Sequence, residues 1–444
     1  MLHSIHPAIL SRYDGAYSVL QLILGILVLL ATLWLLIKRH DTRTVLIGSG
    51  LLLCLVSFSP MDAFAAFSKR MTTAGLIEAI CASMGFAYVM KYTRCDASLV
   101  QILTKGLSRL GIFLVPMAVM VTFVISIAIP SAAGVSAAVG ATLIPLLIAA
   151  KVHPAIAGGA VLSGTLGAVL NPGVAHNAFI ANIAKMNVMD LVFYHAPISI
   201  ACGVICAVSL MIVAMVRKEL NYQAGQDISA TTTTSDTENP PDEKPHYLHA
   251  LAPFIPVLLL VFSNAGWLGK TEMNVPAAML IGSIYALFIT RSSACQLTKE
   301  FFNGMGSAYA NILGIIIAAA VFIEGLQACG IIKSFITLLT QYPEFARWGG
   351  TIGPFMMGLI TGTGDATAFA FNEAVTPHAG SFGYEIPNLG VGVMLAACLG
   401  RNMSPLAGAA IVCAGLAGVN PVDMIKRTAP GMIVAVIVVA LFFL

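Results

Sequence analysis

Charged side chains are scarce in this 444-residue sequence, because Asp, Glu, Lys and Arg together make up 10% of it while hydrophobic residues make up 58%. A water-soluble protein cannot cover its surface with so little charge. The net charge is only +3 and is spread over many short polar segments, which excludes the basic patch of a nucleic-acid-binding protein. The apolar runs are long enough to cross a bilayer as helices. The composition therefore predicts an all-α polytopic membrane protein.

Motifs of enzymes and metal centres are also missing. The nine cysteines form neither C-x-x-C pairs nor Cys/His clusters, so we interpret them as small hydrophobic residues within apolar segments. The segment Asn264–Thr271 resembles a phosphate-binding loop, but asparagine replaces its first glycine and no strand precedes it. Gly362 and Gly364 form a G-x-G without a βαβ context. The sequence predicts no enzyme, no organic cofactor and no metal other than Na⁺ as a coupling ion.

Apolar segments divide the chain into two similar halves. Each half has five of them, and between the third and the fourth lies an apolar stretch with a polar break in its middle, 110–150 or 348–378. We interpret each such stretch as a re-entrant hairpin, because non-helical backbone within a bilayer needs protein or a water-filled cavity around it. Since five spans is an odd number, the second half should be inverted relative to the first. The predicted spans are 18–38, 45–58, 71–91, 155–186 and 195–216, followed by 250–264, 274–290, 309–328, 388–416 and 429–444.

The segment 217–249 separates the two predicted repeats, 18–216 and 250–444. It contains TTTTSDTENPPDEKP, which is polar, includes prolines and has no apolar periodicity, so we expect a flexible linker. If the linker is cytoplasmic, the segments on that side hold most of the 23 Lys and Arg residues, as the positive-inside rule requires.

Glycine-rich and proline-marked breaks recur at matching places in the two halves. IPSAAGVSAA (129–138) is followed by LNPGVAHN (170–177), and ITGTGDATAF (360–369) is followed by RNMSPLAG (401–408). Paired breaks of this kind mark the binding sites of secondary transporters.

Each predicted hairpin tip is also suited to an anion. The second half-helices, expected to begin near Val135 and Ala366, would point unpaired N–H groups toward the membrane centre, where they favour a carboxylate. Two tips that approach from opposite sides would suit a ligand with two carboxylates.

Polar residues at these breaks are the candidate substrate ligands. Arg401 is the only basic residue expected near mid-membrane, where it costs roughly 2.5–3.5 kcal/mol, and its planar fork can hold a carboxylate. The alternative is a structural ion pair with Asp365 or another buried acid. His176 is a candidate proton carrier or donor, or else a satisfied interior group, and the hydroxyls either contact substrate or cap the hairpins. The predicted substrate-binding residues are Ser131, Gly134, Ser136, His176, Thr361, Gly362, Thr363, Gly364, Thr367, Arg401 and Ser404.

Side-chain oxygens at the same breaks are candidates for a coupling ion, Na⁺ or H⁺. Asn171, Asn177 and Asn402 could hold a small cation together with backbone carbonyls. Alternatively, their amides only satisfy the frayed helix ends. Asp365 could bind a cation or a proton, or it could cap the helix expected to begin at Ala366.

Several segments resemble the DcuC-type anaerobic C4-dicarboxylate carriers, a family of the ion transporter superfamily. The resemblance is carried in the second half by 361–371 and 398–430, and in the first half by 86–100 and 129–162, so that it spans most of the chain. The GR-x-x-SP and KRT segments are its more specific part. The tip GTGDATAF, where the family often has GSGNAPF, and the segment LNPGVAHN depart from the family pattern.

The resemblance implies a carrier of the bacterial inner membrane for succinate, fumarate, malate or a related dicarboxylate, working as an exchanger or coupled to a cation. It also implies a homodimer in which the hairpins and the broken spans move as an elevator against a scaffold made of spans 1–3 and 6–8. One alternative is a carrier of the same architecture for a tricarboxylate or an amino acid, whose α-amino group would lie against Asp365. A channel lined by the broken helices is the other.

Overall fold

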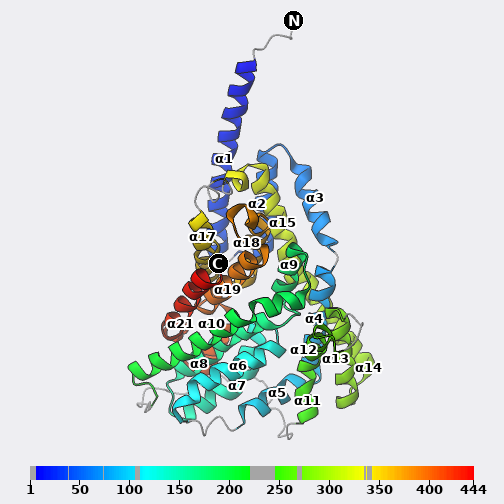
Figure 1. Cartoon of the computed structure of the whole chain (residues 1–444), viewed down its shortest axis with the longest axis vertical. Coiled ribbons are helices and arrows are strands. Elements are labelled where there is room, and N and C mark those ends of the chain that lie inside the picture. Colours follow the sequence, from blue (N-terminus) through cyan, green and yellow to red (C-terminus); the bar gives the residue numbers. More distant parts are fainter. Residues whose placement is uncertain are drawn as a thin grey trace.

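The computed structural model describes residues 7–38, 40–73, 75–105, 111–220, 246–267, 273–334, 337 and 343–444. Every regular element in these ranges is helical and none is a strand, which confirms the all-α prediction (Figure 1). Within them, six helices are long and apolar enough to cross a bilayer, or seven if one bent pair counts as a single span, and six shorter apolar helices accompany them. The predicted total of ten spans stays a prediction.

Helices α1 to α4 and α11 to α15 pack mainly with one another, and we call them the scaffold group. In this group α4 contacts α13 and α14, and α2 contacts α15. Leu53 of α2 and Val89 of α4 are completely buried between these helices. The bounds are α1 Pro7–Ile37, α2 Thr42–Val56, α3 Pro60–Met71, α4 Leu76–Tyr92, α11 Tyr247–Leu251, α12 Ile255–Asn264, α13 Val275–Thr290, α14 Ala294–Ala308, the π-helix η5 Tyr309–Leu313 and α15 Gly314–Ala328.

Helices α6 to α10 and α17 to α21 form a second unit, the hairpin group. Here α6 contacts α8, α7 contacts α20, α10 contacts α21 and α17 contacts α19, so helices from both halves of the sequence interleave. Helix α5 (Cys95–Thr104) contacts both groups. The bounds are α6 Leu114–Ala128, α7 Ala132–Ala149, α8 Pro154–Gly164, η3 Thr165–Leu170, α9 Ala175–Ala184, α10 Val188–Val216, α17 Pro343–Thr361, α18 Gly364–Ala374, η6 Thr376–Phe382, α19 Ile386–Asn402, α20 Gly408–Ala417 and α21 Pro421–Phe442.

Short breaks interrupt both predicted hairpins. Residues 129–131 separate α6 from α7, and residues 362–363 separate α17 from α18. The second half-helices begin at Ala132 and Gly364, a few residues earlier than predicted. Gly362 has a φ of 72°, and a β-carbon there would also lie 2.9 Å from the backbone of Leu406, so the turn requires glycine. The re-entrant path of the hairpins stays a prediction.

The two predicted broken spans are also interrupted where the sequence places proline. The α8–η3 segment ends at Leu170 and α9 begins at Ala175, while α19 ends at Asn402 and α20 begins at Gly408. Each broken span is held close to a hairpin at one glycine. A β-carbon at Gly167 would overlap the carbonyl oxygen of Phe123, and one at Gly400 would overlap that of Phe355.

Two predicted spans are preceded by a further helix. The span expected at 71–91 is preceded by α3, which meets α4 at an angle of 54°, and the span expected at 309–328 continues an apolar helix that already begins at Ala294. Charged and polar residues in α3 and α14 lower the local hydropathy, so these helices do not stand out as apolar segments in the sequence. Most of the predicted linker, 221–245, lies outside the described residues.

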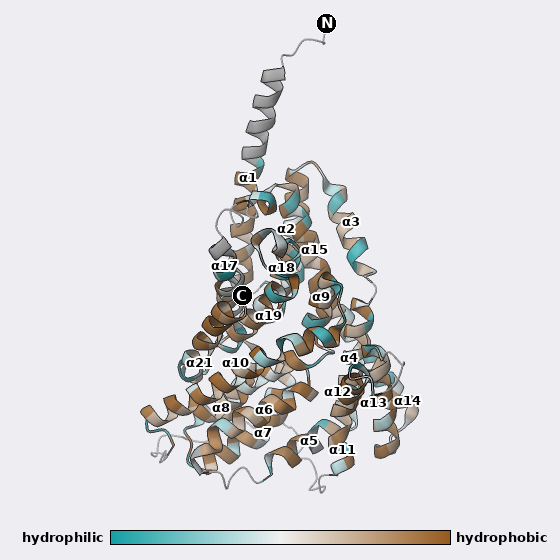
Figure 2. Ribbon diagram, viewed as in Figure 1, coloured by the Kyte–Doolittle hydropathy of each residue, from teal (hydrophilic) through white to brown (hydrophobic). Residues whose placement is uncertain are grey.

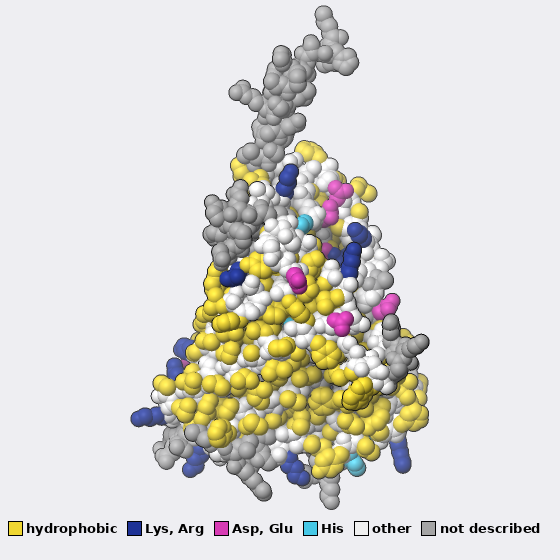
Figure 3. All heavy atoms as spheres, viewed as in Figure 1, with side chains coloured by type: hydrophobic (Ala, Val, Ile, Leu, Met, Phe, Trp, Pro, Cys, Tyr) yellow, Lys and Arg dark blue, Asp and Glu magenta, His cyan; other side chains and the backbone are white. Residues whose placement is uncertain are grey.

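The outer surface matches a membrane environment. Helices α10 and α21 are predominantly hydrophobic, whereas α3 carries hydrophilic residues (Figure 2). Hydrophobic side chains cover much of the face drawn in Figure 3, and Lys and Arg lie along its lower margin. Large side chains such as Val216 and Phe288 are strongly exposed. An apolar surface of this extent is expected of a protein in contact with lipid.

A buried ion pair joins two helices of the hairpin group. Arg427 of α21 donates from Nε and Nη2 to the two carboxylate oxygens of Glu219, which follows α10, at 2.9 and 2.6 Å. Arg427 Nη1 donates to the carbonyl oxygen of Asp423, and both members of the pair are buried. Because the carboxylate and the guanidinium satisfy each other in this geometry, removing one partner would leave an uncompensated buried charge.

We predict that Glu219→Leu lowers the stability of the protein by about 3–5 kcal/mol, because the guanidinium of Arg427 then stays buried without a counter-charge. Thermal unfolding of the purified protein in detergent measures this effect as a lower melting temperature. The double variant Glu219→Leu/Arg427→Met should recover most of the loss, since two apolar side chains leave no charge to solvate. A double variant as unstable as the single one would show that the loss is not electrostatic.

Candidate substrate site

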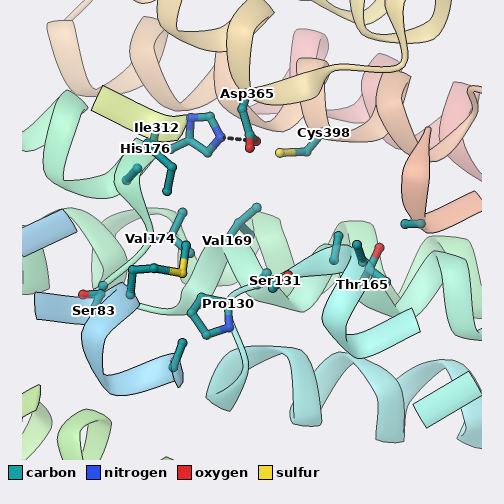
Figure 4. A pocket seen from close by; sticks show the side chains of 18 of the residues that line it. Ser83, Pro130, Ser131, Thr165, Val169, Val174, His176, Ile312, Asp365 and Cys398 are labelled. Carbon is teal, nitrogen blue, oxygen red and sulfur yellow. Dashed lines mark hydrogen bonds and ion pairs between the residues drawn. The ribbon is translucent and has the colours of Figure 1, made fainter. Parts of the chain in front are cut away.

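The hairpin tips and helix breaks meet at one cavity of about 340 Å³. It is lined by Ser131 beside the first tip, Asp365 beside the second tip and Arg401 beside the second helix break, while α4 and η5 contribute residues from the scaffold group. Figure 4 shows Asp365 and Cys398 on one side of the space, with Pro130 and Ser131 across from them. The cavity therefore lies between the two groups of helices.

Four helices, α7, α9, α18 and α20, begin at this cavity and line it with residues of their first turns. The residues that precede α9, α18 and α20 are Val174, Thr363 and Ala407, and none of them caps its helix with a side-chain hydrogen bond. The first N–H groups of a helix have no partner within the helix, and this end carries about half a positive charge. Four such ends around one space favour an anion.

Arg401 lies in the last turn of α19 and is half-buried in the cavity wall. Its Nε and Nη2 donate to Oδ1 of the neighbouring Asn402, at 3.3 and 3.2 Å. Among the described residues it forms no ion pair with Asp365, so the predicted structural pair is not present. The amide of Asn402 orients the guanidinium but does not neutralise it, and the positive charge remains available to a ligand.

Asp365 pairs instead with His176. The Nε2 atom of His176, in the first turn of α9, lies 2.9 Å from Oδ1 of Asp365, in the first turn of α18. The imidazole stacks on Phe369 with ring centroids 4.5 Å apart, and only 5% of its side chain is exposed, whereas 57% of the Asp365 side chain is exposed. Asp365 does not cap α18. The pair links the two halves of the sequence at the cavity wall.

Three predicted hydroxyl ligands lie elsewhere. Thr361, Thr363 and Thr367 line a separate apolar cavity of about 310 Å³ between the α17–α18 hairpin and helices α1, α2 and α15. Thr363 and Thr367 are four residues apart and share one side of α18, whereas Asp365, two residues from each, lies on the other side. Thr367 Oγ1 donates to the carbonyl oxygen of Thr363 at 3.0 Å, the back-bonding alternative. These threonines do not line the cavity that Asp365 and Arg401 share, and their role as substrate ligands stays a prediction.

Of the remaining predicted substrate ligands, some line the cavity and others lie behind its wall. Ser131 lines the cavity and its Oγ accepts the N–H of Gly134. Ser404 is buried, and its Oγ accepts the N–H of Leu406 within the second break. Ser136 is buried away from the cavity, and Gly134, Gly362 and Gly364 shape the tips without lining the space.

The three asparagines at the breaks satisfy backbone groups. Their Nδ2 atoms donate to main-chain carbonyl oxygens: Asn171 to that of Ile127, Asn177 to that of Val169 and Asn402 to that of Leu162. Their Oδ1 atoms accept hydrogen bonds from Gly173, His195 and Thr165, respectively. These bonds match the structural alternative stated for the asparagines, and a role in cation coupling stays a prediction.

Sequence reasoning missed some of the cavity wall. Cys398 lies three residues before Arg401 on the same side of α19, and this helical spacing was the available signal. Ser83 of α4 and Thr165 of η3 also line the space, but both lie within apolar segments that offer no local pattern. Among the described residues, no group of three or more His, Cys, Asp or Glu side chains is placed to hold a metal ion.

Comparison with known proteins gives relatives over nearly the whole chain. An uncharacterized transporter of Haemophilus influenzae is 49% identical over 281 residues, covering 62% of this chain and 100% of the relative. A second uncharacterized transporter of the same organism is 60% identical over 136 residues, 31% of this chain and 94% of the relative. The anaerobic C4-dicarboxylate transporter DcuC of Escherichia coli K12 is 24% identical over 455 aligned residues, 95% of each chain.

The sequence model of the DcuC family, described as "C4-dicarboxylate anaerobic carrier", matches residues 55–444. This match covers the cavity, both hairpins and both helix breaks. The chain therefore belongs to the DcuC family, and it is a multi-pass transporter of the bacterial inner membrane and not an enzyme.

Proposed function

We propose that this transporter carries C4-dicarboxylates of the succinate, fumarate and malate type. The observation that carries the proposal is the convergence of four helix N-termini and the Arg401 guanidinium on one cavity. Its volume of about 340 Å³ lies at the small end of ligand pockets, which run from roughly 300 to 1,000 Å³. A small molecule with two carboxylates uses this concentration of positive potential better than a neutral one.

Each end of the substrate has its own anchor in this proposal. The fork of Arg401 binds one carboxylate with two parallel hydrogen bonds, which an ammonium group cannot reproduce. The N-termini of α7 and α9 and the hydroxyl of Ser131 receive the other carboxylate across the cavity. The name of the relative from Escherichia coli, a C4-dicarboxylate transporter, agrees with this substrate class.

The transport cycle in this proposal moves the hairpin group against the scaffold group. Three observations support it: the two groups pack mainly within themselves, the cavity lies between them, and the hairpin group carries most of the cavity wall. The matched breaks and the matched close contacts at Gly167 and Gly400 support an inverted repeat. The homodimer belongs to the same expectation and rests on the resemblance to the family.

We predict that proteoliposomes loaded with unlabelled succinate transiently accumulate labelled succinate by counterflow, because a carrier with one alternating site exchanges ligand across the membrane. Uptake should be measured with and without Na⁺ and at two pH values, which separates cation coupling from pure exchange. Protein-free liposomes are the control, and a channel would equilibrate the label without accumulation. If succinate, fumarate and malate all fail to give counterflow under every condition, the proposed substrate class is wrong.

We also predict that Arg401→Lys weakens succinate binding roughly 10- to 100-fold, because the variant loses a bidentate hydrogen bond to a charged group. Isothermal titration of the detergent-solubilised protein measures the dissociation constant directly. Arg217→Lys is the matched control, since Arg217 is exposed at the end of α10, far along the chain from the cavity residues. Unchanged affinity in Arg401→Lys would contradict the assignment of Arg401 as the carboxylate anchor.

One ion pair crosses between the groups and offers a test of their relative motion. Arg70 of α3 pairs with Glu373 of α18, and its guanidinium also lies 5.8 Å from the ring centroid of Phe179 in α9. We predict that cross-linking Arg70→Cys to Glu373→Cys with a reducible spacer stops succinate exchange but leaves binding intact. Cys295→Ser should be the background, because the other eight native cysteines are buried. Exchange must return after reduction, and full exchange in the cross-linked protein would refute separation of the two groups.

A further inference from the structure

Among the residues that the structure describes, Asp365 carries the only acidic side chain in the wall of the cavity. One of its oxygens, Oδ1, is bonded to His176 Nε2. The other, Oδ2, has no partner among the described residues, and the side chain is 57% exposed to the cavity. Figure 4 shows the carboxylate pointing into the open space beside Cys398. Asp365 therefore presents a charged hydrogen-bond acceptor to a ligand in the cavity.

The partner of Asp365 occupies only one of its two oxygens. His176 Nε2 donates to Oδ1, so Nδ1 is the second ring nitrogen, and it is buried without any hydrogen-bond partner. The bond to His176 therefore leaves Oδ2 of Asp365 open as a hydrogen-bond acceptor.

The negative charge of Asp365 is a problem for a plain dicarboxylate. Succinate and fumarate have only acceptor atoms in their polar groups, so neither can satisfy the open oxygen of Asp365, and their own carboxylates repel it. Arg401 forms no ion pair with Asp365 in the described part of the chain, so it does not occupy the open oxygen. A ligand with a hydrogen-bond donor on the carbon next to its carboxylate resolves the conflict, since the donor can face Asp365 while the carboxylate faces Arg401.

We propose that Asp365, held by His176, is the specificity-determining residue of the site and selects C4-dicarboxylates that carry a hydroxyl or ammonium group at C2 over unsubstituted ones. This inference rests on the proposed function, and it narrows the substrate class to malate-like and aspartate-like ligands. His176 is a positioning residue, because it holds Oδ1 and leaves Oδ2 directed toward the ligand.

The test is equilibrium binding of L-malate, L-aspartate and succinate to the full-length protein in detergent, by isothermal titration. The wild-type protein should bind L-malate or L-aspartate with a dissociation constant roughly 10-fold or more below that of succinate. One hydrogen bond to a charged group changes a dissociation constant by about this factor. In Asp365→Ala this ratio should fall to about 1, because only the donor-bearing ligands lose a contact. Thr367→Val is the matched control, since it removes a hydroxyl from the opposite side of α18 and should keep the wild-type ratio.

The variant Asp365→Asn distinguishes the hydroxyl donor of malate from the ammonium donor of aspartate. Its amide oxygen still accepts a hydroxyl but offers no charge to an ammonium group, so aspartate should weaken more than malate. Equal affinity of wild type for all three ligands, or an unchanged ratio in Asp365→Ala, would overturn the inference and leave the dicarboxylate carrier intact. Failure of wild type to bind any of the three would instead overturn the proposed function and the inference with it. The wild-type ratio decides even if a variant does not fold.

Discussion

The structure depends on one constraint, which is that a helix interrupted inside a membrane must have its free backbone groups satisfied by protein or by ligand. In this protein the free carbonyl oxygens and the free N–H groups at the breaks have different partners. The carbonyl oxygens near the breaks receive hydrogen bonds from the amides of Asn171, Asn177 and Asn402. The N–H groups at the starts of α9, α18 and α20 receive no side-chain cap. The asymmetry leaves an excess of donors facing the cavity, and an anion is the ligand that can use them.

The same constraint explains why the cavity needs both groups of helices. Breaks and tips can lie at membrane depth only where neighbouring helices shield them from lipid, and α4 and η5 of the scaffold group close the side that the hairpin group leaves open. The close contacts at Gly167 and Gly400 hold each broken helix against its hairpin, so the tips and breaks form one unit. The cavity wall is therefore built mainly from one packed unit, with α4 and η5 completing it.

The position of the helix breaks around the cavity could be predicted from the sequence, because glycine and proline mark breaks in helices regardless of what packs around them. The segments 129–138 and 360–369 contain the two tips, and 170–177 and 401–408 contain the two broken spans. Arg401 was identifiable for a similar reason, since a basic residue between apolar segments needs a partner that the sequence does not supply.

The orientation of individual side chains could not be predicted. Helix α18 contacts α15 on one side and α19 on another, and its sequence does not say which side meets which helix. Thr363 and Thr367 were therefore expected beside Asp365, but they line a different cavity. The partner of Asp365 is 189 residues away in the sequence, and no local pattern could connect it to His176.

Three ion pairs that involve the hairpin group, one of them shared with the scaffold group, differ in how completely each carboxylate is satisfied. In Glu219–Arg427 both oxygens accept hydrogen bonds and both residues are buried, so the pair is complete and fixes two helices. In Arg70–Glu373 the second oxygen of Glu373 is buried without a partner, so this pair is less complete. In His176–Asp365 the second oxygen is also unpaired, but it faces the cavity. The free-energy cost of an unpaired acceptor is smallest where a ligand can donate a hydrogen bond to it. Of these three carboxylates, Asp365 is the one in that position.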